Sequence, residues 1–191
     1  MTAPAAESDE ELMARLQRGD DNALNALMDR WQVPMRGYLY RYTQSEATAH
    51  DLAQDTFVRI YQHRHRYKTG ARFKTWLFTI ATNLCRNHAR WRRRHPAESL
   101  DEFDFKESMA LMREDNSPAD ALRDQEKIAA VRSAIDGLPH DLRAVTLLFE
   151  YEDLSHAEIA VVLDCSPKAV ETRLYRARLM LKARLTPYLS S

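Results

Sequence analysis

The sequence predicts an all-helical protein made of two small domains. Apolar residues recur at spacings of three and four through most of residues 8–95 and 117–188, which is typical of helices that bury one face. Glycine is scarce, with four residues in 191, and this favours helices over turn-rich sheets. An acidic stretch with weak periodicity separates the two parts. We therefore expect an N-terminal domain over 8–95, a flexible acidic linker over 96–116 and a C-terminal domain over 117–188.

The first two helices have recognisable boundaries. Residues 8–11 (SDEE) form a capping box, with Ser8 as N-cap and Glu11 reaching back to it. Gly19 can end this helix in the left-handed conformation. One apolar face of a second helix then follows, and Pro34 lies near the start of the next segment. The residues of that face are Leu24, Leu27, Met28 and Trp31.

Two stronger amphipathic helices complete the first domain. Ser45 caps the first of them. The basic loop 68–72 precedes the second, and this second helix stops before Pro96 because the residue before a proline disfavours the helical conformation. The first buries Ala49, Leu52, Ala53, Thr56, Phe57 and Ile60 and exposes Asp51, Gln54, Asp55, Arg59 and Gln62. The second buries Phe73, Trp76, Leu77, Ile80 and Leu84 and exposes Thr75, Thr79, Asn83, Arg86, Asn87 and Arg90.

The second domain contains a predicted helix-turn-helix. Its first helix is capped by Ser117, has Pro118 at its first position and carries the apolar stripe Ile128, Val131 and Ile135. A short helix follows Pro139, with Leu142, Val145 and Leu148 on its apolar side. Residues 155–158 form a second capping box, residues 164–165 make a short turn, and residues 166–167 start a last helix. That helix buries Val170, Leu174, Ala177 and Leu181 and exposes Lys168, Glu171, Thr172, Arg173, Tyr175, Arg176 and Arg178. Its size suits the major groove of DNA.

Charge is strongly segregated along the chain, although the formal net charge is zero. Residues 59–94 contain eleven Lys and Arg and no acid, and residues 164–191 contain six bases against two acids. One acidic segment precedes these two basic segments, and another separates them. Two basic segments predict two contacts with a polyanion, the alternative being solvated helix faces. A compact state that brings the two signs together would make the free chain bind DNA poorly.

Other classes of protein find little support in the sequence. There is no apolar run long enough to span a bilayer and no signal peptide, so we expect a cytoplasmic protein without membrane insertion. The cysteines Cys85 and Cys165 fit a reducing compartment and are expected to be buried small apolar residues. We find no metal-ligand spacing, carboxylate cluster or phosphate-binding loop, and we therefore expect no metal, no cofactor and no enzymatic activity.

Three motifs, taken in order, resemble the extracytoplasmic-function sigma factors of bacterial RNA polymerase. Residues 51–57 (DLAQDTF) resemble the family's D-L-x-Q-[ED]-T-F stretch, and residues 73–83 (FKTWLFTIATN) resemble its F-x-x-W-L-x-x-I-A-x-N helix. The segments 138–143 (LPHDLR), 154–160 (LSHAEIA) and 173–178 (RLYRAR) look like its C-terminal domain signature. The resemblance spans about residues 8–188.

This resemblance implies a division of labour. The N-terminal domain would bind core RNA polymerase and would melt and read the minus-ten promoter element. The C-terminal domain would read the minus-thirty-five element. An anti-sigma factor, often membrane-anchored in the family, would control the activity of the protein. The implied polymerase-binding residues are Asp51, Gln54, Asp55 and Arg59. The minus-ten set is Lys68, Arg72, Lys74, Asn83, Arg86, Asn87 and Arg90, and the minus-thirty-five set is Lys168, Glu171, Thr172, Arg173, Tyr175, Arg176 and Arg178.

Several residues have competing interpretations. Asn83 and Asn87, one turn apart on a basic face, suit the reading of unstacked bases more than helix stability. Trp76 is expected in the core rather than as a stacking platform. The chain has KAVET at 168–172 where many family members have G-T-V-[RK]-S. Glu171 either complements the positive helix N-terminus or accepts a hydrogen bond from a cytosine. The acidic linker either mimics nucleic acid in a basic channel or stays disordered.

Two other functions compete with the sigma factor. A stand-alone helix-turn-helix regulator would bind its operator as a dimer, but the sequence shows no heptad or extra apolar helix for dimerisation. An enzyme acting on nucleic acid would need a catalytic constellation that the sequence does not show. Tight binding to core polymerase in the absence of DNA would distinguish the sigma factor from both.

Overall fold

The computed structural model describes residues 7–68, 70–95 and 118–189, and every regular element in these ranges is helical. The expected linker and the Ser117 cap lie outside the described residues. The first half contains α1 (Asp9–Gln17), α2 (Asn22–Thr43), α3 (Glu46–His63), the 3-10 helix η1 (Arg64–Arg66) and α4 (Phe73–Arg94). The second half contains α5 (Pro118–Asp136), α6 (His140–Glu150), α7 (His156–Leu163) and α8 (Pro167–Leu189).

The predicted helix starts are confirmed by their capping hydrogen bonds. The backbone N–H of Glu11 donates to Ser8 Oγ over 3.3 Å, while the Glu11 carboxylate accepts from the Ser8 backbone N–H over 2.7 Å. The second capping box, at Ser155 and Glu158, is present in the same form. Ser45 accepts from the backbone N–H of Thr48 at the start of α3. Each cap satisfies a donor that the first helical turn leaves free.

The expected segment boundary near Pro34 was wrong, because α2 runs unbroken through this proline. Proline removes one backbone hydrogen bond from a helix and disfavours its interior. Here the apolar face continues on both sides of Pro34, and Leu27, Met35 and Tyr38 are all fully buried. The packing of this continuous face outweighs the local preference for a break.

Most of the predicted apolar stripes are confirmed as core. All six stripe residues of α3 are buried, as are Phe73, Leu77 and Leu84 of α4. Trp76 is half-buried and packs against the core, as expected. Thr75, expected on the exposed face, is instead buried. The reason is that α4 has a second packed side, against α7 of the other half.

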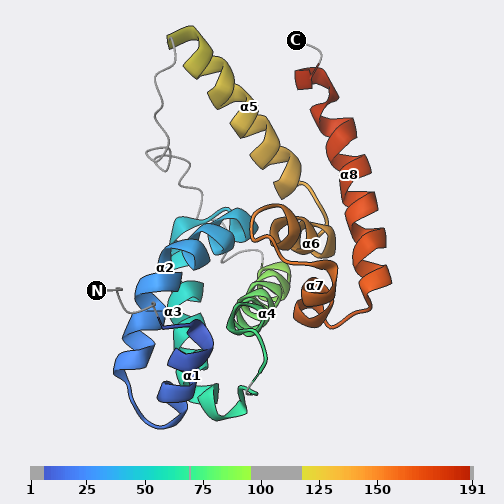
Figure 1. The fold of residues 1–191 in the computed structure, drawn as a ribbon. Coiled ribbons are helices and arrows are strands. Elements are labelled where there is room, and N and C mark those ends of the chain that lie inside the picture. The colour runs from blue at the N-terminus through green and yellow to red at the C-terminus, as the bar shows by residue number, and fades with distance from the viewer. Residues whose placement is uncertain (1–6, 69, 96–117, 190–191) are drawn as a thin grey trace, which may run out of the picture.

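Two expectations about the second half need correction. The predicted stripe of α5 is buried only at Ile135, whereas Ile128 and Val131 are 45% and 37% exposed. Among residues 125–136 of α5, whose side chains the structure describes, buried residues occur only at the C-terminal end, although the helix lies beside α8 (Figure 1). Cys85 is buried as expected, but Cys165 is only partly buried because it lies in the turn between α7 and α8.

The two halves pack against each other through α4, which lies in the middle of the molecule. Figure 1 shows α4 between the first three helices and the helix-turn-helix, where it contacts α7, while α2 reaches α6. Buried apolar residues from both halves form one continuous cluster. The predicted DNA-reading helix of the first half is therefore also the main surface on which the second half rests.

Candidate polymerase and nucleic-acid interfaces

The outer face of α3 presents the predicted polymerase-binding residues to solvent. Asp51, Gln54, Asp55 and Arg59 are all exposed, because the buried stripe of α3 takes the opposite side of the helix. Val58 lies on the same outer face and is 52% exposed. Sequence analysis missed Val58, although a lone apolar residue on a polar helix face is the signal that would have found it. A rim of charge around an exposed apolar side chain is a composition that suits a protein interface.

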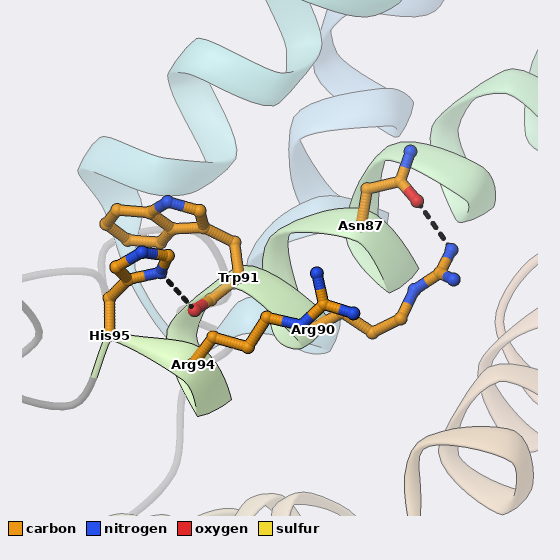
Figure 2. A pocket seen from close by; sticks show the side chains of 5 residues that line it. All are labelled: Asn87, Arg90, Trp91, Arg94 and His95. Carbon is orange, nitrogen blue, oxygen red and sulfur yellow. Dashed lines mark hydrogen bonds between the residues drawn. The ribbon is translucent and has the colours of Figure 1, made fainter.

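The middle of α4 leaves part of the minus-ten set open. Asn83, Asn87 and Arg90 are exposed, and so is Lys68 in the preceding loop. Arg90 Nη2 donates to Asn87 Oδ1 over 2.7 Å. This bond engages the amide oxygen and leaves the two N–H donors of the amide facing outward, so Asn87 is oriented as a donor. Asn83, Asn87 and Arg90 thus lie together on one helix, whereas Lys68 lies in the loop before it, and Figure 2 shows the bond between Asn87 and Arg90.

The rest of the minus-ten set is held by the second half of the molecule. Arg72 Nη1 lies 2.6 Å from Glu158 Oε1, and Arg86 Nη2 lies 3.9 Å from Asp141 Oδ1. Lys74 Nζ donates to the backbone carbonyl of Glu152. Three of the seven predicted DNA-binding residues therefore contact groups of the helix-turn-helix half. These three cations are therefore engaged by negative or partly negative groups of the second half.

Glu152 is the most buried acid at this junction, with 7% of its surface exposed. Its Oε1 lies 3.7 Å from Arg41 Nη1, and the guanidinium of Arg41 also covers the ring of Tyr151 at 4.5 Å. Burial raises the pKa of Glu152 to about 7, against the opposing effects of Arg41 and Lys74. Sequence analysis missed Arg41 and Glu152, because nothing in their local pattern indicates a contact between distant segments.

Arg143 of α6 forms a second tie between the halves. Its Nη1 donates to the backbone carbonyl of Tyr42 over 2.8 Å, and its Nη2 forms an ion pair with Asp136 Oδ1 at 2.9 Å. The ring of His140 stacks on Tyr42 beside it. Arg143 Nε and Tyr42 Oη are buried with no hydrogen-bond partner among the described residues. Polar contacts thus tie α6 to α2 at the junction, but two buried polar atoms remain unpaired there.

The first turns of α8 present the predicted minus-thirty-five surface. With about 100° of rotation per residue, Lys168, Glu171, Thr172 and Tyr175 share one face. All four are exposed, and Arg176 and Arg178 lie exposed to either side. Arg178 Nη2 lies 3.2 Å from Glu150 Oε1.

Arg173 does not belong to this face. It is half-buried and turns toward the α7–α8 turn, where its Nη1 donates to Cys165 Sγ over 3.4 Å. Its predicted place on the exposed surface was wrong, because its helical position is about 100° from Thr172, on the side facing α7.

Glu171 has a partner that the sequence analysis did not consider. Lys168 Nζ donates to Glu171 Oε2 over 2.8 Å, one turn earlier on the same helix. The hydrogen bond from Lys168 lowers the pKa of Glu171, so the carboxylate is ionised at neutral pH. A neighbouring cation offsets the repulsion between this carboxylate and DNA phosphates. The pair therefore makes a carboxylate compatible with a DNA-facing position.

Metal-binding clusters and membrane-spanning helices are both absent from the described ranges. No group of three or more His, Cys, Asp or Glu there has an arrangement that could hold a metal ion. Among the helices of these ranges, none is both long and apolar enough to cross a membrane.

Both halves match known protein families. Residues 27–95 match the family model for sigma-70 region 2, and residues 128–181 match the model for sigma-70 region 4. The first match includes the outer face of α3 and the exposed residues Asn83, Asn87 and Arg90 of α4. The second match includes the helix-turn-helix.

Related proteins cover nearly the whole chain. The RNA polymerase sigma-H factor of Pseudomonas aeruginosa is 34% identical over 186 residues, which is 96% of each chain. The extracytoplasmic-function sigma-E factor of Escherichia coli K12 is 31% identical, over 94% of this chain and 95% of its own. Among solved structures, CnrH in complex with the cytosolic domain of CnrY is similar with a TM-score of 0.69, at 28% identity over 95% of this chain and 99% of that chain. The fold is also that of RpoE from Bartonella quintana, with a TM-score of 0.63 at 22% identity over 85% and 96% of the two chains. The chain belongs to the extracytoplasmic-function sigma factors, a family of transcription initiation factors.

Proposed function

We propose that this sigma factor binds core RNA polymerase through the outer face of α3 and selects promoters through α4 and α8. The observation that carries this proposal is the presence on one chain of an exposed acidic face and two separate basic helices. Residues 8–95 would dock and read the minus-ten element, and residues 117–188 would read the minus-thirty-five element. Residues 96–116 would connect them. The chain would act in the cytoplasm without catalysis of its own.

Run-off transcription from a promoter library tests this function. Core polymerase with the full chain as its only sigma factor should give transcripts from a subset of promoters that share two spaced sequence elements. Core polymerase alone is the control. Transcripts that start without regard to upstream sequence, or no transcripts at all, would contradict the proposal.

Asn83 and Arg90 should separate sequence choice from general affinity. Asn83→Ala removes an amide that can pair with a base edge, so it should change the ranking of minus-ten variants in the library. Arg90→Ala removes a phosphate-binding cation, so it should weaken all promoters alike and reduce the dependence of binding on salt. Both variants should fold and bind polymerase as the parent does. An unchanged minus-ten ranking in Asn83→Ala would remove this residue from the reading surface.

Glu171 should contribute to the choice of the minus-thirty-five element. It accepts from Lys168 through one oxygen, which leaves the other free to accept from a cytosine amino group. A correct contact of this kind is worth about 1–3 kcal/mol of discrimination. Glu171→Arg should therefore shift the preferred minus-thirty-five sequences in the library. Glu126→Arg, which makes the same change in net charge at an exposed position of α5, is the matched control. A uniform change in all activities in Glu171→Arg would show that only its charge matters.

We also propose that an anti-sigma factor controls this chain. The similar protein CnrH is bound by the cytosolic domain of CnrY, which supports a protein regulator of this class. Such a regulator would hold the factor away from polymerase until a signal releases it.

A further inference from the structure

The basic loop 68–72 connects η1 to α4, and α1 contacts the elements on both sides of it. Lys68 and Arg72 are the two members of the proposed minus-ten set that lie outside α4, and both are exposed. Gly70 has a φ of +89°, which suits glycine, and the backbone N–H of Ala71 donates to the Lys68 carbonyl over 3.0 Å. A surface loop moves unless other groups hold it, so the residues that tie this loop down affect how its cations are presented.

Gln17, the last residue of α1, holds the entrance to the loop. Its Nε2 donates to the backbone carbonyl of Arg64 over 2.8 Å and to that of Tyr67 over 2.9 Å. Both N–H groups of this amide are therefore used. The two carbonyls belong to the first residue of η1 and to the residue that follows η1, where the chain leaves helical geometry. Gln17 thus fixes the direction in which the chain enters the loop.

Glu10, in the first turn of α1, holds the exit from the loop. Its Oε1 accepts from the backbone N–H of Phe73 over 2.9 Å. Phe73 is the first residue of α4, and the N-cap residue Arg72 forms no side-chain capping bond. The first turn of a helix leaves its N–H groups without helical partners, and the Glu10 carboxylate satisfies one of them. The start of α4 is therefore tied to α1.

Tyr67 supports the loop from the inside. Its side chain is almost fully buried, and its ring packs against that of Trp76 with the centroids 5.2 Å apart. Its hydroxyl donates to the backbone carbonyl of Ala71. Burial, together with the negative charge of Glu10, raises the pKa of Tyr67 to about 12, so the hydroxyl keeps its proton at neutral pH. The entrance, the interior and the exit of the loop are all anchored, while its cations face solvent.

We propose that Gln17 and Glu10 are positioning residues for minus-ten recognition, which present the basic loop 68–72 to the melted promoter strand in one conformation. The inference rests on the proposed function, because it is there that Lys68 and Arg72 contact promoter DNA. A loop that is already ordered loses less conformational entropy when it binds, and it adapts less readily to a wrong base. Loss of these anchors should therefore lower the discrimination between bases as well as the affinity.

The first test removes the anchor at the entrance. Gln17→Met eliminates both donors and keeps an unbranched side chain. In run-off transcription by holoenzyme over a library of minus-ten variants, base discrimination should fall about 5-fold or more at a position other than the one changed by Asn83→Ala. The minus-thirty-five preference should stay parental. Gln32→Met, the same substitution at an exposed position of α2, is the matched control. A purely structural defect would weaken all promoters alike and leave their ranking unchanged.

The second test separates the hydrogen bond of Glu10 from its charge. The amide oxygen in Glu10→Gln can still accept from the Phe73 N–H, so this variant should keep the parental minus-ten ranking. Glu10→Met has no acceptor and should change the ranking as Gln17→Met does. Equal losses of discrimination in both Glu10 variants would assign the effect to charge and would overturn the positioning role of Glu10.

Amide hydrogen exchange in the free full chain reports on the loop without any DNA. Gln17→Met should accelerate exchange of the Tyr67 and Ala71 N–H groups about 5- to 100-fold, the effect expected from losing two hydrogen bonds. Unchanged exchange, or faster exchange with an unchanged minus-ten ranking, would overturn the inference. The proposed function would still stand if Asn83→Ala changed the ranking in the same library. A parent chain without any minus-ten preference would instead overturn the proposed function, whatever the exchange rates.

Discussion

Reversing two charges on α3, Asp51→Arg with Asp55→Arg, should weaken binding to core polymerase at least a hundredfold. Both carboxylates are exposed on the outer face of α3, away from the core. Loss of one partner from a close interfacial charge pair costs about 2–5 kcal/mol, and reversal adds repulsion. The free energy of unfolding should change by less than about 0.5 kcal/mol, because exposed substitutions rarely do more. Titration of labelled polymerase measures the first effect and chemical denaturation the second.

A charge-matched control distinguishes a docking site from a general effect of net charge. Asp21→Arg with Asp29→Arg makes the same change in net charge on exposed residues at the start and in the middle of α2. This variant should bind polymerase like the parent. Equal affinities for both double variants and the parent would remove the α3 face from the polymerase interface.

Local sequence patterns predicted most of the helices and the division into two halves. Helix caps and apolar stripes depend on residues close together along the chain, so they can be recognised from the sequence. The capping boxes at Ser8 and Ser155 and the stripe of α3 are read directly from residues three and four apart. The exposed part of the minus-ten set was predictable for the same reason. Contacts between distant segments were not. Burial of Thr75 depends on where the second half comes to rest, and no local pattern encodes that position.

A second large effect is expected at the junction between the halves. Glu152→Arg places a third cation against Arg41 and Lys74 in a buried position, and an uncompensated buried charge costs about 3–5 kcal/mol. The free chain should open, and Arg72, Lys74 and Arg86 should become available. Its radius of gyration in solution scattering should increase. Its affinity for promoter DNA should rise tenfold or more, since negative groups of the second half no longer compete with phosphates.

The matched variant Glu152→Gln separates the charge from the contact, through pH. The closed form raises the pKa of Glu152 to about 7. In the open form the Glu152 carboxyl has its ordinary pKa. The closed form is therefore most stable relative to the open form at low pH, and it loses this stability as the pH rises through 7. Burial also lowers the pKa of His140 at the same junction, which favours closure as the pH rises. The open fraction of the parent should grow between pH 5 and 8, whereas that of Glu152→Gln should not grow. If the radius of gyration of Glu152→Arg equals that of the parent, or if both bind promoter DNA with equal affinity, autoinhibition by the closed state is contradicted.

The unpaired polar atoms at the junction, Tyr42 Oη and Arg143 Nε, determine how temperature acts on the molecule. Both atoms gain water as a partner when the halves separate, so leaving them unpaired opposes closure. The exposed ion pairs nearby add at most about 1 kcal/mol each. Apolar residues of both halves are also buried on closure, and this contribution weakens on cooling. Cold should therefore favour the open chain, in which Arg72, Lys74 and Arg86 are released, so the junction should respond to temperature without any partner protein.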